Sequence, residues 1–166
     1  MGSAINKKAQ AAAQRILDQA VAERAIPAWT RPLEALMNHP AIRRACIPAS
    51  NGLMNARSIA CHYAALIGDG FEGVRLLREE TLAEALRLRP IPGVERPEDP
   101  GRGLGYAFMG PSDAPASVFG HGGYGGSTGY ADRRHCLAVG VAKARTNGGG
   151  VADEAVRAVR AGLGIG

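Results

Sequence analysis

A glycine-rich stretch, residues 119–132, surrounds a single histidine, His121, with six glycines. Glycine at that density suits a backbone that approaches another group closely or adopts positive φ. The histidine is then held by main chain and not under bulky neighbours. The stretch therefore predicts one wall of a functional site. A tightly twisted sheet with His121 on an exposed edge would explain the same residues.

Three of these glycines, Gly120, Gly122 and Gly125, match the spacing of a dinucleotide-binding fingerprint. That motif requires a strand before it, a helix opening at its third glycine and an acidic residue about 20 residues further on. The residues that follow, 126–130, are poor helix formers, so no strand–helix–strand unit is available. We therefore expect antiparallel strands and no cofactor.

The stretch from Phe119 to Asp132 resembles the third signature box of the serine β-lactamase and penicillin-binding-protein-like hydrolases. Esterase-like members of that family often carry His-Gly-Gly where β-lactamases carry Lys-Thr-Gly. Upstream, residues 48–66 resemble the family's small-residue loop and the helix after it, and residues 73–86 resemble its Gly-x-Arg-Leu-Leu-Ser element. Residues 36–49 are most similar to plant and algal members. The resemblance covers about residues 33–163, in the family's order.

The resemblance implies a role for each residue of this box. In the family, the strand that carries it supplies one backbone N–H of the oxyanion hole, and the match assigns that role to Tyr124. His121 stands at the position of the family's basic residue. Gly122 and Gly123 would let an acyl group of the substrate lie against the strand. His121 and Tyr124 are thus the candidate catalytic residues, and the two glycines the candidate substrate-binding residues.

The family's nucleophile is missing from this chain. The family takes its serine from a Ser-x-x-Lys box and moves the proton with a Tyr-x-Asn or Ser-x-Asn box. No serine here is followed three positions later by lysine, and no Tyr-x-Asn occurs. The resemblance therefore implies a homologue of ester- or amide-hydrolysing enzymes that is inactive alone, either a split hydrolase or a fragment. The alternative is a non-catalytic structural or interaction subunit of a larger assembly.

Both functions imply another polypeptide, which supplies the missing N-terminal half or covers the exposed sheet. The substrate and the identity of that partner are not encoded in any motif. Nucleic acid is not an expected partner, because the net charge of +5 comes from scattered or paired basic residues and not from a run interleaved with aromatics. A membrane span is not expected either, because no run of 18 apolar residues occurs.

The cysteines indicate the compartment. Cys46, Cys61 and Cys136 show no C-x-x-C spacing and cannot all pair, so we predict buried, small apolar residues in a reducing, intracellular compartment. A plastid or a mitochondrion stays open as that compartment. Cys61-His62 and His135-Cys136 are adjacent pairs and not metal-ligand spacings, so no metal site is predicted.

The order of elements predicts an α+β fold, an antiparallel β-meander covered by N- and C-terminal helices. By resemblance it is part of a β-lactamase-like (DD-peptidase-like) domain. Residues 1–26 are predicted to be an N-terminal helical extension, with a helix over 4–25, and residues 27–166 the C-terminal part of that domain. Short helical turns are expected over 27–48. The further predicted helices span 55–67, 79–86 and 151–163, and the predicted strands span 104–109, 117–121, 128–132 and 136–144.

Two packing expectations follow from this arrangement. The last helix is expected to lay Ala155, Val156, Val159 and Leu163 on the sheet. Loss of the family's N-terminal helical layer is expected to leave apolar surface exposed around the strand of the glycine-rich stretch and under Ile59, Tyr63 and Leu66. A partner chain, a homo-oligomer or the helix over 4–25 is expected to cover that surface.

Overall fold

The computed structural model describes residues 33–48, 52–89, 101–144 and 150–165, and it divides the chain into two compact units, Met1–Gly52 and Leu53–Gly166. In the first unit, α2 (Leu33–Asn38) and α3 (Pro40–Arg44) are the short helical turns predicted between the prolines. Pro40 begins α3, where its missing N–H has no helical partner to lose, and the His39 side chain accepts a hydrogen bond from Ala41 N. The predicted helix over 4–25 and the domain boundary at residue 26 lie outside the described residues.

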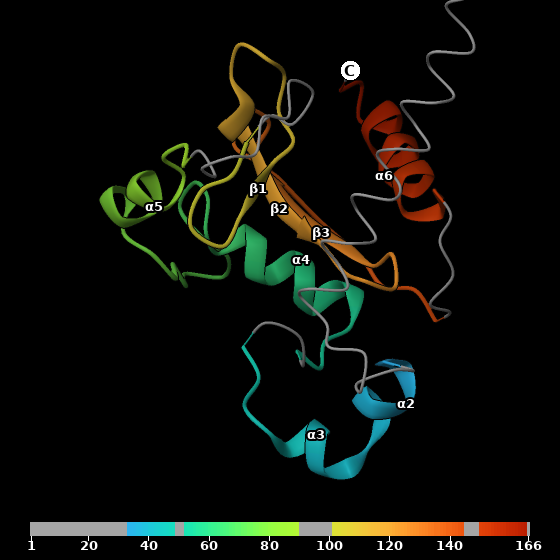
Figure 1. Ribbon diagram of the computed structural model, residues 1–166. Coiled ribbons are helices and arrows are strands. Elements are labelled where there is room, and N and C mark those ends of the chain that lie inside the picture. The colour runs from blue at the N-terminus through green and yellow to red at the C-terminus, as the bar shows by residue number, and fades with distance from the viewer. Residues whose placement is uncertain (1–32, 49–51, 90–100, 145–149, 166) are drawn as a thin grey trace, which may run out of the picture. The chain divides into compact units, whose positions relative to one another are not determined.

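The second unit is built on an antiparallel sheet in the order β1-β2-β3-β4 (Figure 1). Its strands are β1 (Ala107–Phe108), β2 (Val118–Gly122), β3 (Thr128–Asp132) and β4 (Leu137–Val141). The α+β class and the meander are confirmed. The strand predicted over 104–109 is only two residues long in the structure, and its Ala107 also forms an isolated antiparallel bridge with Arg102.

One face of the sheet is covered by α4 (Ala56–Ala64), which the Asn55 side chain caps by accepting a 2.9 Å hydrogen bond from Ser58 N. The helix lies directly on strand backbone: a Cβ added at Gly140 would come within 2.3 Å of Ala56 O, and one at Gly129 within 2.4 Å of Ile59 Cγ2. Glycine at these two positions therefore sets the close approach of helix and sheet.

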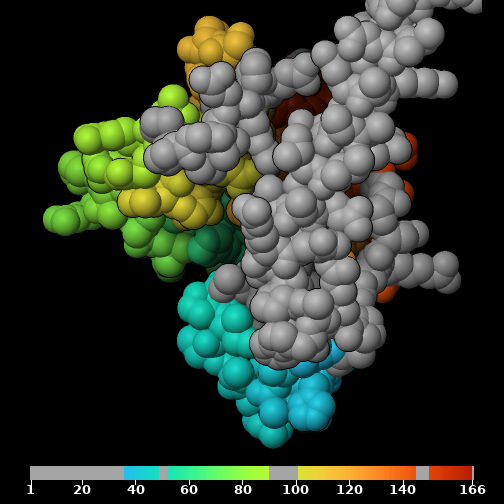
Figure 2. Space-filling model, in the orientation of Figure 1, coloured from blue at the N-terminus to red at the C-terminus, as the bar shows by residue number. Residues whose placement is uncertain are grey.

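The main core lies on this face. Tyr63 and Leu66, which are 8% and 1% exposed, pack with Phe119 of β2 and with Leu82 of α5 (Glu79–Ala85). The expectation that apolar surface under Ile59, Tyr63 and Leu66 stays exposed is wrong, because helix and sheet of the same chain bury it. The green surface of α5 borders the yellow segment that follows residue 100 (Figure 2), and there Leu104 N donates to Ala85 O over 2.7 Å.

The opposite face is covered by α6 (Val151–Gly162). Ala152 is buried, and Val156 packs on a cluster of Val118, Tyr130 and Val139. The predicted apolar face is wrong in part, since Val159 and Leu163 are 43% and 58% exposed. Near the C-terminal end of the helix it is Arg160 that contacts the sheet, where it pairs with Asp132.

The predicted burial of the cysteines is also wrong for two of the three. Cys46 and Cys136 are exposed, and Cys61 is half-buried. Cys136 lies in the turn between β3 and β4 with a φ of 48°. It belongs to a bend of the backbone and not to a packed position. Among the helices of the described residues, none is long and apolar enough to cross a membrane.

Candidate functional site

The four residues predicted from the glycine-rich box gather at the turn end of the β2–β3 hairpin. His121 lies opposite Gly129 in the register, which places its side chain on the α4 face, and its ring is exposed. Its Nδ1–H donates to the carbonyl of the next residue, Gly122, over 2.6 Å. The imidazole is therefore held by local main chain. Neither a serine hydroxyl nor a carboxylate is its partner in this contact.

The residues after His121 form an open turn. A Cβ at Gly122 would meet nothing within 4 Å. Gly123 N donates to Ser127 O over 2.6 Å, and Tyr124 at the tip of the turn is 71% exposed. On the α4 side, burial raises the pKa of the Tyr63 hydroxyl, and a hydrogen bond with the His121 backbone acts in the opposite direction. At this end of the sheet, the backbone of residues 122–124 and the imidazole of His121 are exposed to solvent, and the space over Gly122 is open.

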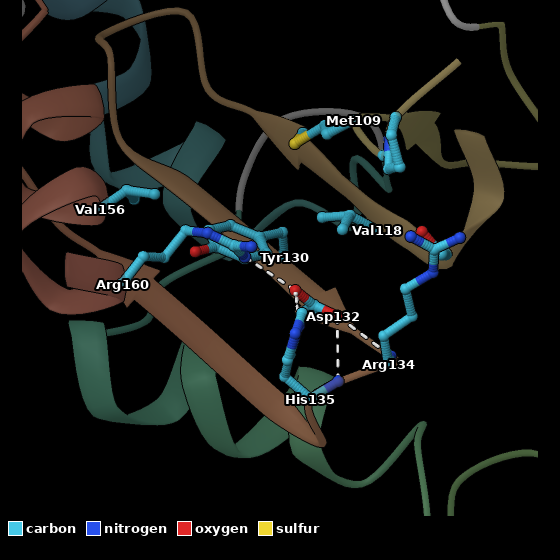
Figure 3. A pocket seen from close by; sticks show the side chains of 11 residues that line it. Met109, Val118, Tyr130, Asp132, Arg134, His135, Val156 and Arg160 are labelled. Carbon is cyan, nitrogen blue, oxygen red and sulfur yellow. Dashed lines mark hydrogen bonds and ion pairs between the residues drawn. The ribbon is translucent and has the colours of Figure 1, made fainter. Parts of the chain in front are cut away.

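A second group of polar residues lies on the other face of the sheet, around Asp132 (Figure 3). This carboxylate ends β3 and is 1% exposed. Its Oδ1 accepts from the backbone N–H groups of Arg134 (3.0 Å) and His135 (3.2 Å). Its Oδ2 lies 2.8 Å from His135 Nδ1 and 2.7 Å from Arg160 Nη1. One buried acid thus joins the β3–β4 turn to α6.

The electrostatics of this group follow from those contacts. Burial by itself raises the pKa of Asp132, but the hydrogen bonds from Arg160 and His135 outweigh it and hold that pKa below its ordinary value. The same ion pair raises the pKa of Arg160. Both groups are therefore charged at neutral pH, and the pair is a fixed dipole at the end of the sheet.

A pocket of about 380 Å³ opens next to this ion pair. Its apolar wall comes from Met109, Val118 and Val156, and its polar end from Asp132, Arg160, and the turn residues Arg134 and His135. Two hydroxyl groups of lining residues are buried, and one of them, Ser117 Oγ, has no hydrogen-bond partner among the described residues. The other hydroxyl, that of Tyr130, contacts Arg160: burial raises its pKa, and a hydrogen bond with Arg160 and the charge of that residue act in the opposite direction.

The sheet separates the two groups. Residues of a strand alternate between its faces, so Gly129 and Ala131 face α4, while Tyr130 and Asp132 face α6. Sequence reasoning identified the hairpin end but missed the pocket. Part of the pocket has a local signal in the sequence. An aspartate at a turn commonly accepts hydrogen bonds from the backbone N–H groups two and three residues after it, as Asp132 does here. Nothing in the sequence pairs it with Arg160, which is 28 residues away.

Known proteins offer no template for either site: no family model matches this sequence, and neither does a curated protein or a solved structure. In the described part of the chain, no three His, Cys, Asp or Glu side chains are grouped so as to hold a metal ion. The chemistry must therefore be argued from the residues themselves.

Proposed function

We propose that this chain is a β-lactamase-related serine-hydrolase homologue that does not hydrolyse substrates alone and that presents half of a hydrolytic site to another polypeptide. In this proposal, His121, Gly122, Gly123 and the backbone N–H of Tyr124 are the half that this chain contributes. The other polypeptide contributes the activated serine and the group that moves its proton.

The observation that carries the proposal is the exposed position of His121 at the end of β2, with open space over Gly122. A substrate and a second protein surface could both reach this point. The order of the sequence elements supports it too, since a capped helix, an antiparallel meander and a covering helix follow one another as they do in the family that the sequence resembles.

Two measurements on the full chain test this function. A fluorophosphonate probe should leave the protein unlabelled, because no Ser-x-x-Lys box is present; stoichiometric labelling of any serine would overturn the proposal. In the second measurement, the ¹⁵N-labelled chain is titrated with benzylpenicillin, which has an acyl group and a carboxylate. The amide signals of residues 121–124 should shift.

The histidines provide the matched control for that titration. His121→Ala should weaken the response, whereas His62→Ala, which changes an exposed histidine of α4, should leave it unchanged. Signals of residues 121–124 that do not move, or that move equally in both variants, would remove His121 and its neighbours from the proposed half-site.

The second candidate function is a non-catalytic structural or interaction subunit, and exposed apolar residues of α6 favour it. Val151, Val159 and Leu163 are 59%, 43% and 58% exposed and follow one another at helical spacing. Sedimentation of the full chain distinguishes the two functions. Self-association that Val159→Lys abolishes would favour an assembly role, and a monomer at all concentrations would count against α6 as a contact between copies.

A further inference from the structure

We propose that the free edge of β4 joins two copies of this chain in an antiparallel pair, with α6 of each copy beside α6 of the other. β4 ends the sheet, and no strand of the described residues pairs with its outer edge. Its five residues, Leu137–Val141, include neither proline nor a charged side chain, which are the usual means by which proteins block an edge. The inference rests on the second candidate function, whose partner it names, and not on the half-site at His121.

Two residues of β4 turn their backbone groups away from β3. Lys143 N, which lies in line with β4, donates to Ser127 Oγ on the β3 side over 3.0 Å. The direction of the N–H groups alternates along a strand, so Val139 bonds toward β3 as Lys143 does, whereas Ala138 and Gly140 face outward. Each outward residue can donate one hydrogen bond to an added strand and accept one from it.

The exposed apolar stripe of α6, formed by Val151, Val159 and Leu163, lies on the same side of the unit as this edge. Val156 and Arg160 line the pocket beside β2. Successive helical residues are about 100° apart around the axis, so Val159, one residue before Arg160, lies on the flank away from the pocket and toward β4. Val151, two turns earlier, lies on the same flank. Among the strands, α6 packs most extensively with β4.

An antiparallel pair centred on Val139 would satisfy the outward groups. Ala138 then lies opposite Gly140 of the second copy, and the two residues exchange both of their N–H···O=C bonds. Charges do not oppose this pairing, because the cations at the two ends of β4 turn back to their own chain. Lys143 Nζ lies beside the turn between β2 and β3, and Arg134 reaches Asp113 in the segment before β2.

The same two-fold axis brings the two α6 stripes together. The middle of α6 packs on the cluster that includes Val139, so an axis at Val139 passes near the middle of the helix. Val151 of one copy then faces Leu163 of the other, and the small Ala155 faces Val159. The stripe is exposed in the single chain, so the pairing removes apolar surface from water.

The size of the contact indicates a weak, reversible dimer. A strand of five residues is about 17 Å long, and a helix–sheet–helix sandwich is about 20 Å across, so each copy buries roughly 350 Å² of flat area. Standard interfaces bury about 800 Å² on each partner. We therefore expect a dissociation constant on the order of 100 µM.

The test compares amide hydrogen exchange of the ¹⁵N-labelled full chain at about 30 µM and about 1 mM, with sedimentation equilibrium on the same samples. Exchange at Ala138 and Gly140 should slow about threefold at the higher concentration, in proportion to the loss of free monomer. Exchange at Val139, whose N–H bonds to β3 within one copy, should not change and is the internal control.

Matched variants locate the contact. Ala138→Pro removes an outward N–H, a change that edge strands tolerate, and should weaken dimerisation at least about tenfold. Val159→Lys adds a charge to the α6 stripe and should also weaken it. Ala158→Lys adds the same charge to the next residue, which is exposed and lies on the outer side of the helix, and should not.

A cross-link gives an independent measurement. In the proposed register, residue 142 lies opposite Cys136 of the second copy, and both residues are exposed. Ala142→Cys should therefore form a disulfide with Cys136 of another copy under mild oxidation, because facing residues of such a pair have the Cα separation that a disulfide needs. Ser112→Cys, at an exposed position in the segment before β2, should not.

The outcomes separate the inference from the function on which it rests. A monomer at all concentrations overturns both. Self-association without slower exchange at Ala138 and Gly140, or self-association that Ala138→Pro leaves intact, overturns the pairing through β4 and leaves an assembly role standing. Should Ala138→Pro fail to fold, as judged by circular dichroism, a missing cross-link in Ala142→Cys overturns the pairing instead.

Discussion

Removing the charge of Asp132 should destabilise the second unit more than any other single polar substitution on the α6 face. Asn at this position keeps the shape of the side chain, and its amide oxygen can still accept from the N–H groups of Arg134 and His135. It loses the ion pair with Arg160, whose side chain is 20% exposed and would stay largely buried without its counter-ion. Removing one partner of a buried pair costs about 3–5 kcal/mol. The residual exposure of Arg160 argues for the lower end, about 3 kcal/mol.

The assay is urea unfolding of the full chain at pH 7, with the free energy of unfolding extrapolated linearly to water. A double-mutant cycle with Arg160→Met separates the ion pair from the turn contacts. The combined variant should be about 2 kcal/mol more stable than the sum of the two single losses predicts, because it contains no unpaired buried charge. A loss below about 1 kcal/mol for Asp132→Asn, or additive losses in the cycle, would refute a stabilising role for this pair.

The difference in unfolding free energy between wild type and Asp132→Asn should depend on pH with a definite sign. The pKa of Asp132 is lowered in the folded chain, so its contribution is complete above the ordinary value of 3.8 and is lost as the pH falls through the folded value. The stability gap between wild type and Asp132→Asn should therefore persist from neutral pH down to the region of 3.8 and should shrink below it. A gap that closes well above that pH would contradict a lowered pKa.

Four further substitutions test the fold. Gly140→Ala should lower the free energy of unfolding by about 1–3 kcal/mol, because the added Cβ would come within 2.3 Å of Ala56 O. Gly122→Ala, whose added Cβ would meet nothing within 4 Å, should change the urea midpoint little. Equal effects of the two substitutions would contradict the close packing of α4. Asn55→Ala removes the cap of α4 and should cost about 1 kcal/mol in the same assay, and no loss would mean that the cap contributes nothing. Ser117→Ala deletes a hydroxyl without a partner and should leave the unfolding free energy unchanged or raise it by about 1 kcal/mol, so a clear loss would indicate a hydrogen bond to that oxygen.

Local patterns in the sequence predicted much of the second unit. The strand over 128–132 has the predicted bounds, and α4 begins with Asn55 as its cap, at the start of the helix predicted over 55–67, because both depend on neighbouring residues alone. The helix predicted to reach residue 67 ends at Ala64, and turns lead from there to Gly68 at a φ of 54°. The chain direction therefore already changes before this glycine.

The arrangement on the α6 face could not be predicted in the same way. Counting apolar residues selects Val159 and Leu163 for the buried side of α6, because an arginine is normally solvent-facing. The long-range pair with Asp132 instead buries Arg160, while Val159 and Leu163 stay exposed. The pocket depends on this pair, together with the segment after β1, so no single segment of sequence contains its signal. The candidate half-site at His121, in contrast, is contiguous in sequence and was identified as one stretch.

The contact of α4 with Gly140 also bears on how the chain folds. Ala56 and Gly140 are neighbours in space but are separated by most of the second unit in sequence. Bringing such distant segments together requires closing a long loop before the contact is made, which slows folding relative to a helical bundle of similar size. Synthesis of the chain on the ribosome delivers α4 first and β4 much later. The apolar side of α4 therefore stays uncovered until nearly the whole unit has been synthesised. The nascent chain is most prone to aggregation during this interval.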